Sequence, residues 1–188
     1  MDAAEAWNLR STAEPVCSAA DVAAAIRRVA HEITATLSAH YPLVLTVMGG
    51  GVVFTGQLLP LLDFPLAFDY LHVTRYRDAL AGGTLQWKVL PGEAVAGRVV
   101  LVLDDILDEG HTLAAIRDRI VAAGAAGFYS AVLADKDIGR AKPIAADFVG
   151  VTVPDRFVFG VGMDVKGMWR NLPAIYAVKE EGRDSESK

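Results

Sequence analysis

The first part of the chain contains apolar residues at helical spacing. These positions lie three or four residues apart, which places them on one face of a helix. They are Val22, Ile26, Val29, Ile33 and Leu37. The pattern predicts a helix over residues 19–39 with Ser18 as its N-cap, and Pro42 prevents its continuation.

Short unbroken apolar runs predict buried strands farther along the chain. Residues 43–48 form one such run, and three glycines separate it from a second apolar stretch at residues 52–62. This order predicts a strand, a tight turn and a helix. A branched apolar run at residues 98–103 predicts a central parallel strand that ends at two aspartates, with a helix over residues 112–123 after it. The other predicted strands cover residues 66–74, 85–89, 127–134, 148–153, 157–161 and 174–178.

Strands and helices alternate along most of the chain, which is typical of an α/β protein with a mostly parallel twisted sheet flanked by helices. Ligands of such sheets bind at the carboxyl ends of the strands. With 188 residues, one domain over residues 1–178 is expected, and the charged segment 179–188 is predicted to be a disordered tail.

The composition narrows the classes of function. The chain is 53% hydrophobic with a net charge of −5, so it has no overall field that would attract nucleic acid or an anionic membrane. Residues 41–62 carry no charge and could span a bilayer, but two prolines and four glycines divide them, which favours a strand, a turn and a helix. A single cysteine, Cys17, excludes a disulfide framework, and the first ten residues lack a secretory signal. A cytoplasmic protein is expected.

Acidic residues gather after the strand predicted at residues 98–103. Asp104 and Asp105 follow it directly, Asp108 comes three positions later, and Gly110 leads into the next predicted helix. Carboxylates suit ribose hydroxyls or hydrated Mg²⁺, whereas free amides at a helix N-terminus suit a phosphate. The combination predicts a sugar phosphate site. A charged turn without function is the alternative, and it leaves three aspartates at a buried strand end without a use.

This segment resembles the diphosphoribosyl-binding signature of the type I phosphoribosyltransferases, and within them the hypoxanthine-guanine (6-oxopurine) phosphoribosyltransferases. Residues 99–112 read VVLVLDDILDEGHT, and only Glu109 departs from the family pattern, which has Thr or Ser at that position. The resemblance extends over about residues 43–178, with the remaining motifs in the family's order. It implies the type I phosphoribosyltransferase fold, with a small hood over the base site formed by the N-terminal and C-terminal segments.

For the sugar donor, 5-phosphoribosyl 1-diphosphate (PRPP), the resemblance implies a set of binding residues. Asp104 and Asp105 would bind the ribose and Mg²⁺, and Asp108 would act as the base near purine N7. The following loop would hold the 5-phosphate through Glu109, Gly110, His111 and Thr112. Because a carboxylate close to a phosphate is repelled by it, the Glu109 side chain is expected to turn toward solvent or a basic neighbour.

Three further matches concern the diphosphate and the loop that closes over the reaction. Residues 47–50, VMGG, are similar to the family's pyrophosphate loop, in which the backbone of Met48 and Gly49 would contact the diphosphate. In that loop a non-proline cis peptide bond often precedes the second residue. Arg170 matches an arginine that contacts the diphosphate. Arg75 and Tyr76 resemble the start of a flexible loop that closes over the reaction, where the family usually has Ser-Tyr.

Motifs in the last third of the chain resemble the family's purine site. Lys136 matches the lysine that reads the purine O6, and Phe157 matches the aromatic residue that stacks on the base. The Val158 backbone would pair with the purine edge, and Asp164 would lie near the exocyclic position and a second Mg²⁺. Without these motifs, Phe157 would be interpreted as a core residue and Lys136 as a surface lysine.

The resemblance thus implies purine salvage, in which the 5-phosphoribosyl group of PRPP moves to N9 of hypoxanthine or guanine to give IMP or GMP and diphosphate. A homodimer or homotetramer is expected. The alternative is a regulator of the same fold that senses the sugar diphosphate without turnover and binds nucleic acid, which the acidic composition disfavours.

Other features of the sequence are weaker indications of function. Residues 104–108 also match the DDxxD pattern of prenyl diphosphate synthases, but those enzymes carry it on helices of a large all-helical chain. The histidines offer no cluster for a metal, and a structural or surface role is expected for His31, His40 and His72. No base is identifiable near Cys17, which is expected to be inert.

Overall fold

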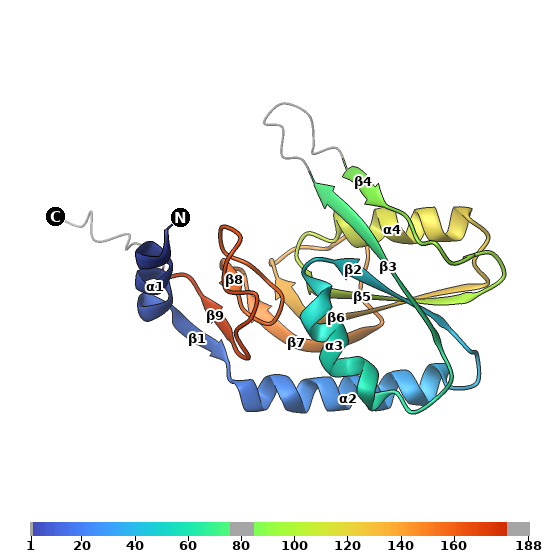
Figure 1. Cartoon of the computed structure of the whole chain (residues 1–188), viewed down its shortest axis with the longest axis horizontal. Helices are drawn as coiled ribbons and strands as arrows, with labels where there is room; N and C mark the ends of the chain where they lie inside the picture. Colours follow the sequence, from blue (N-terminus) through green and yellow to red (C-terminus); the bar gives the residue numbers. More distant parts are fainter. Residues whose placement is uncertain (1, 76–84, 180–188) are drawn as a thin grey trace.

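The computed structural model describes residues 2–75 and 85–179, so Tyr76 and the predicted tail from residue 180 lie outside the described residues. The described chain forms a central sheet with helices on both faces and a smaller sheet beside it (Figure 1). This is the α/β arrangement with a mostly parallel sheet that the alternation of strands and helices predicts.

The central sheet contains six strands in the order β4-β3-β2-β5-β6-β7. They are β2 (Leu43–Met48), β3 (Ala67–Arg75), β4 (Leu85–Val89), β5 (Val99–Leu107), β6 (Gly127–Asp137) and β7 (Phe148–Pro154). All neighbouring strands are parallel except β3 and β4, which form an antiparallel pair at one edge. The chain order reverses between β2 and β5, and a crevice for ligands forms at the carboxyl ends of strands on either side of such a point.

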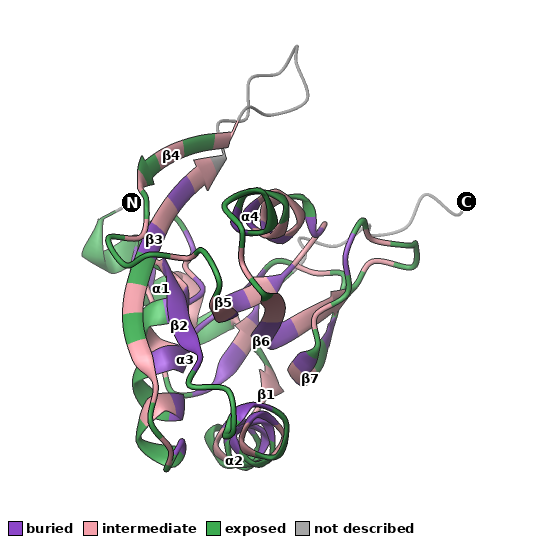
Figure 2. Ribbon diagram, turned by 90° about the vertical axis from the view of Figure 1, so that its right-hand side faces the viewer, coloured by how far each residue is buried: buried purple, intermediate pink, exposed green. Residues whose placement is uncertain are grey.

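Helices cover both faces of this sheet (Figure 2). They are α2 (Ala19–Leu37), α3 (Gly51–Leu58) with the short 3-10 helix η1 (Leu59–Leu61), and α4 (His111–Ala122). Successive residues of β5 point to opposite faces, so Leu101 and Leu103 pack with α2 and α3, while Val100 and Val102 pack with α4. The unbroken apolar run of β5 therefore reflects burial on both faces.

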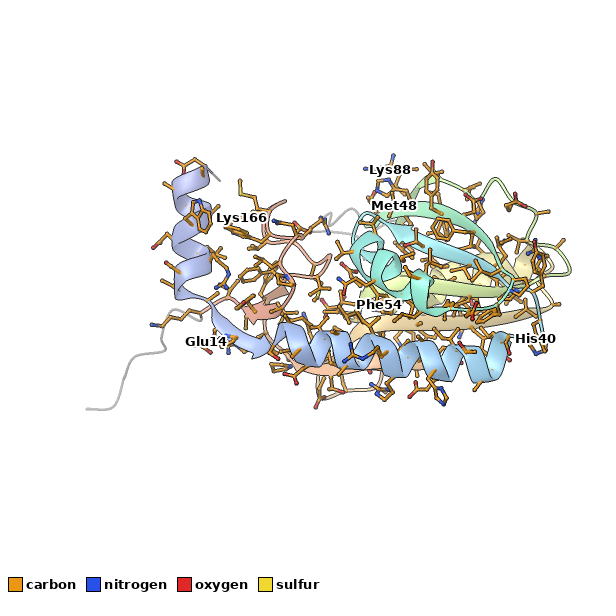
Figure 3. The ribbon with its side chains drawn as sticks, turned by 60° about the horizontal axis from the view of Figure 1, so that its bottom comes forward. Glu14, His40, Met48, Phe54, Lys88 and Lys166 are labelled. Carbon is orange, nitrogen blue, oxygen red and sulfur yellow. The ribbon has the colours of Figure 1, made fainter. Side chains whose placement is uncertain are left out.

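The longest helix, α2, runs along the sheet, with Glu14 near its start and His40 near its end (Figure 3). Ser18 caps it as predicted, because its hydroxyl accepts a hydrogen bond from the Asp21 N–H at 3.2 Å. Phe54 of α3 is fully buried in the same core as the apolar face of α2.

A smaller antiparallel sheet, here called the hood, has the strand order β1-β9-β8. It joins the two ends of the described chain through β1 (Glu14–Cys17), β8 (Val158–Phe159) and β9 (Ile175–Ala177), and α1 (Ala3–Thr12) precedes it. The apolar pattern did not predict α1 or β1. Ala6 is the only buried residue of α1, and an Asp2–Glu5 capping box rather than an apolar face marks its start.

Several predicted boundaries are wrong by a few residues. The strand predicted to end at residue 103 continues to Leu107, because β6 pairs with it as far as Leu107 opposite Asp135. Asp104 and Asp105 therefore lie within β5 rather than after it. The helix predicted over residues 52–62 is split into α3 and η1, and the strand predicted over residues 157–161 is reduced to β8. Among the described residues, no helix is long and apolar enough to cross a membrane.

Candidate functional site

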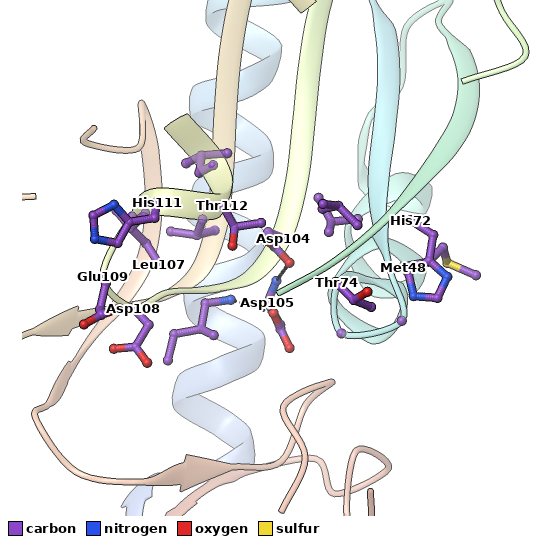
Figure 4. Close-up of a pocket in the computed structure, with 18 of the residues that line it drawn as sticks. Met48, His72, Thr74, Asp104, Asp105, Leu107, Asp108, Glu109, His111 and Thr112 are labelled. Carbon is purple, nitrogen blue, oxygen red and sulfur yellow. Dashed lines mark hydrogen bonds between the residues drawn. The ribbon is translucent and has the colours of Figure 1, made fainter. Parts of the chain in front are cut away.

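A cavity of about 450 Å³ opens at the carboxyl ends of β2, β3 and β5, where α4 begins (Figure 4). Residues that the sequence predicts for the sugar donor and the diphosphate meet here. They are Met48, Gly49, Asp104, Asp105, Asp108, Glu109, Gly110, His111, Thr112 and Arg170. We call this the donor cavity. Arg75 is the last residue of β3, and its side chain, like Tyr76, lies outside the described part of the structure.

The loop from Asp108 to Thr112, here the phosphate loop, turns the chain from β5 into α4. Gly110 is the N-cap of α4 with φ of +84°, a conformation that glycine adopts without strain. A Cβ at Gly110 would also lie 3.3 Å from side-chain atoms of Lys142 and of Pro143. The first amides of α4 have no acceptor within the helix, so this end of the cavity suits an anion.

Two adjacent carboxyls form the floor of the donor cavity, of which Asp105 is buried and Asp104 is half-buried. The Asp105 N–H donates to Asp104 Oδ1, and the Ile106 N–H donates to Asp105 Oδ1, each at 2.9 Å. Burial raises the pKa of Asp104 well above its usual range, and the neighbouring Asp105 adds to this increase. Burial also raises the pKa of Asp105, although Arg170 opposes the increase. Two carboxyls held this close favour a cation or a proton between them.

Glycines bring the turn after β2 against this pair. A Cβ at Gly50 would lie 2.0 Å from Asp105 Oδ2, and one at Gly162 would lie 2.1 Å from the Gly50 carbonyl oxygen. Any other residue at these positions would displace the backbone or the carboxyl. The non-proline cis peptide bond lies between Met48 and Gly49, within the predicted segment but one bond later than the family pattern places it.

Arg170 connects the donor cavity to the hood. Its Nη2 lies 2.6 Å from Asp164 Oδ1, and its Nη1 donates to the Gly162 carbonyl oxygen. The Gly167 N–H donates to the other oxygen of Asp164 at 2.6 Å. The structure thereby brings together two residues that the sequence predicts for different parts of the site, the diphosphate arginine and the aspartate beside the purine.

A second cavity of about 430 Å³, here the base cavity, shares Asp105, Ile106 and Asp108 with the donor cavity. Lys136, at the carboxyl end of β6, contributes its ammonium, which lies 3.1 Å from Asp108 Oδ1. Phe157 lines the same cavity and is 57% exposed, so its interpretation as a core residue is wrong. An exposed ring at the mouth of a cavity is available for stacking.

Val158 presents backbone groups to the base cavity. It lies opposite Ala177 of β9, and the preceding residue, Phe157, accepts a hydrogen bond from the Val178 N–H at 2.9 Å. In an antiparallel pair the next residue then directs its N–H and C=O away from the partner strand. Because β8 is the edge of its sheet, the Val158 backbone faces outward, where Asp164 and Lys136 also line the cavity.

The Glu109 side chain turns to a basic neighbour, as the repulsion argument predicts. Its Oε1 lies 3.2 Å from Arg140 Nη2, and the side chains of Arg140 and Glu109 are 68% and 41% exposed. Arg140 could not be predicted as this partner, because the loop that contains it has no motif.

Two residues of β3 in the donor cavity were missed. His72 lines the cavity beside Met48, its neighbour in the β2–β3 register, so it borders the candidate site, and its expected structural or surface role stays a prediction. The hydroxyl of Thr74 is buried in the cavity wall without a hydrogen-bond partner among the described residues. Their position at the carboxyl end of a parallel strand beside β2 was the available signal.

Among the described residues, no group of three or more His, Cys, Asp or Glu side chains could hold a metal ion by itself. Mg²⁺ is commonly bound by one or two carboxylates together with substrate phosphates. Asp104 and Asp105 fit that pattern, because they are adjacent and both face a cavity that also offers an anion site.

Burial raises the pKa of the Cys17 thiol, which disfavours the reactive thiolate.

Comparisons with known proteins agree with one another. Residues 18–166 match the phosphoribosyl transferase domain. The chain is 32% identical over 162 residues to a hypoxanthine-guanine phosphoribosyltransferase of Streptococcus pneumoniae, covering 86% of this chain and 90% of that protein. It is 34% identical over 161 residues to a hypoxanthine-guanine-xanthine phosphoribosyltransferase of Tritrichomonas foetus, covering 85% and 88%.

The fold is similar to solved structures of hypoxanthine phosphoribosyltransferases. A hypoxanthine phosphoribosyltransferase from Staphylococcus aureus superposes with a TM-score of 0.85 at 25% identity. The match covers 98% of this chain and 100% of that one, so it includes the hood as well as the central sheet.

Proposed function

The chain belongs to the phosphoribosyltransferase family, and we propose that it salvages purines by transferring the 5-phosphoribosyl group of PRPP to N9 of hypoxanthine or guanine. In this reaction the bond from C1 to the diphosphate oxygen breaks, and a bond from C1 to N9 forms. The observation that carries the proposal is a pair of adjoining cavities with Asp108 on their common wall. One cavity suits a sugar diphosphate, and the other suits a flat base.

On the donor side, we assign the 5-phosphate to the phosphate loop, where Glu109, Gly110 and His111 offer backbone amides and Thr112 a hydroxyl. Asp104 and Asp105 bind the ribose hydroxyls. Breaking the bond at C1 leaves positive charge on the sugar and negative charge on the diphosphate, so catalysis consists mainly of positioning and charge stabilisation.

The diphosphate is assigned to the backbone of Met48 and Gly49 and to the guanidinium of Arg170. The Arg75–Tyr76 loop is assigned to closure, which excludes water that would otherwise hydrolyse PRPP. Mg²⁺ would be held by Asp104 and Asp105, with Asp164 at a second position, and it supplies positive charge that neutralises the diphosphate. The proximity of Asp164 to Arg170 supports their joint assignment to the leaving group.

On the base side, the Lys136 ammonium donates to the purine O6 and Phe157 stacks on the ring, while the Val158 backbone pairs with the base edge. Asp108 accepts the proton at N7 as N9 attacks C1. The short distance between Lys136 and Asp108 supports this assignment, because O6 and N7 are neighbours on one edge of a 6-oxopurine.

The test is turnover of hypoxanthine, guanine, xanthine and adenine with PRPP and Mg²⁺. We expect IMP or GMP formation, and a kcat/KM for adenine lower by about a thousandfold or more, because its 6-amino group offers Lys136 no acceptor. Equal turnover of adenine would contradict the 6-oxopurine assignment. Binding of PRPP without turnover of any purine would instead support a regulator that senses the sugar diphosphate.

We also propose that the chain acts in the cytoplasm as a homodimer or a homotetramer. Phe68 and Tyr70 of β3 support the assembly, because they occupy alternate positions of one strand and are 47% and 43% exposed. Large apolar side chains exposed side by side are typical of a protein interface.

A further inference from the structure

Lys142 lies between β6 and β7, outside the motifs of the proposed site, and its side chain is only 12% exposed. Its ammonium donates to the Leu107 carbonyl oxygen at 2.8 Å, the Lys136 carbonyl oxygen at 2.6 Å and Asp135 Oδ1 at 2.5 Å. A lysine ammonium has three N–H donors, so each of them has an acceptor here.

These acceptors lie where β5 and β6 stop pairing. Leu107 is the last residue of β5 and stands opposite Asp135 in the parallel register. The residue after Leu107 is Asp108, and the Lys136 carbonyl belongs to the residue whose ammonium lies 3.1 Å from Asp108. Lys142 therefore bonds to the backbone immediately before the proposed base and to the backbone of the proposed purine reader.

We propose that Lys142 is a positioning residue for phosphoribosyl transfer, fixing Asp108 relative to Lys136 so that N7 and O6 of one purine meet both groups. This inference rests on the proposed function. Lys142 itself lines neither the donor cavity nor the base cavity, so it acts through the two residues that do.

The same segment contacts the phosphate loop at a second place. A Cβ at Gly110 would lie 3.3 Å from the Lys142 Cβ, so the base of the Lys142 side chain lies close to the N-cap of α4. The position of Lys142 thus bears on both substrates, the purine through Lys136 and the 5-phosphate through the loop that contains Gly110.

A residue that served stability alone would affect folding without affecting kinetics at temperatures where the protein is folded. Arg28 of α2 provides a comparison with the same kinds of acceptor, with a side chain that is 51% exposed. It donates to the carbonyl oxygens of Val149 and Gly150 and pairs with Glu32 at 2.9 Å, so it also bonds to two carbonyls and one carboxylate. It belongs to α2, which covers one face of the central sheet, and so lies away from the carboxyl ends of the strands.

The experiment compares Lys142→Met, Lys142→Arg and Arg28→Met with the parent chain, each verified as folded by circular dichroism at the assay temperature. With saturating PRPP, we expect Lys142→Met to lower kcat for hypoxanthine by about tenfold to a hundredfold, because small misplacements of reacting groups have effects of this size. Its discrimination against adenine should fall in parallel. Lys142→Arg should recover part of kcat, and Arg28→Met should keep kcat within about twofold of the parent.

Kinetic parameters of Lys142→Met within about twofold of the parent would overturn the proposal, as would an equal loss of kcat in Arg28→Met. If Lys142→Met does not fold, Lys142→Arg decides, because unchanged kcat and unchanged adenine discrimination would then show that the geometry of the ammonium is unimportant. A parent chain without turnover would contradict the proposed function and, with it, this inference. An active parent beside an equally active Lys142→Met would contradict only the role of Lys142.

Discussion

Asp104 and Asp105 show how a binding site lowers the stability of the fold that contains it. Burial raises the pKa of each of these neighbouring carboxyls. An acid whose pKa is raised in the folded state stabilises the fold below its unfolded pKa, about 3.9 for Asp. That contribution is lost as the pH rises through the folded pKa. Without a cation, this pair therefore makes the protein less stable toward alkaline pH.

Replacement of one of these carboxyls should stabilise the substrate-free protein. Asp104→Asn keeps an oxygen that accepts the Asp105 N–H, but it removes a buried charge. We expect a Tm at pH 8 higher by about 2–4 °C, which corresponds to about 1 kcal/mol in a protein of this size. The difference should shrink as the pH falls toward 4. Calorimetry across this range tests the expectation, with exposed Asp63→Asn as control; a Tm at pH 8 no higher than that of the parent would contradict it.

Asp108 is placed to exchange a proton with the purine, since it lies on the wall common to both cavities. General acid-base assistance is worth about a hundredfold to ten-thousandfold in rate. Asp108→Asn should therefore lower kcat by at least about tenfold, while PRPP affinity stays within a few-fold. Single-turnover kinetics and PRPP titration would separate the two effects, with Asp118→Asn on α4 as the control. An unchanged kcat would exclude Asp108 from the mechanism.

Glu109 occupies a position where its charge opposes the proposed phosphate. A carboxylate about 5 Å from a phosphate is repelled by roughly 3 kcal/mol per pair of unit charges at an effective dielectric constant of 20. The contact with Arg140 turns it aside, so the remaining penalty is small. Glu109→Thr should lower the KM for PRPP by no more than about threefold, whereas Arg140→Met should raise it. Steady-state kinetics at saturating purine measures both, and a higher KM in Glu109→Thr would mean that the carboxylate favours donor binding.

At the scale of elements, α1 is held on the hood by a few side-chain contacts, whereas Val158, Ile175 and Ala177 of the hood belong to the main core. The indole N–H of Trp169 donates to the Ala6 carbonyl oxygen at 3.0 Å, and the Trp7 ring meets the Trp169 ring edge-on at 5.1 Å. Arg10 lies over the Tyr176 ring at 3.7 Å. Because α1 buries only Ala6, these contacts rather than a core hold it on the hood.

Removal of the indole donor should therefore release α1 without unfolding the rest of the protein. Trp169→Phe keeps an aromatic ring but loses a hydrogen bond with a net value of about 1 kcal/mol, which is about a fivefold change in the docking equilibrium. Amide exchange in α1 should accelerate by roughly this factor while exchange in α2 is unchanged. Mass spectrometry of exchanged peptides makes the comparison, and unaltered exchange in α1 would show that other contacts hold the helix.

At the scale of the whole molecule, the features that could be predicted from the sequence were those with a regular apolar pattern or a local motif. The apolar run at residues 98–103 predicted a strand buried on both faces, and β5 packs its alternate residues into two cores. The acidic residues that follow predicted one site, and they line one cavity. Both predictions depend on neighbours along the chain, so a single sequence contains the information they need.

The remainder depends on residues that only the fold brings together. Arg140 and Lys142 lie beside Glu109 and Gly110 of the phosphate loop from more than 30 positions away in the sequence, through a segment without periodicity. His72 stands near the end of the strand predicted over residues 66–74, but it reaches the site only because β3 pairs with β2. The α1 helix has a capping box but no apolar face, so the pattern that identified α2 could not identify it.

The exposed apolar face of β3 leads to the last prediction, the oligomeric state. Phe68 and Tyr70 project from the same side of the strand, and Val52 of α3 and Leu61 of η1 are exposed on the adjoining segments of the chain. If this face joins two copies, Phe68→Asp should shift the protein toward monomer in analytical ultracentrifugation, because a buried unpaired charge opposes association. Val121→Asp on α4, where the replaced side chain is 55% exposed, should leave the assembly intact. A parent chain that sediments as a monomer would contradict the proposed assembly, whereas dissociation only in Val121→Asp would move the interface to α4.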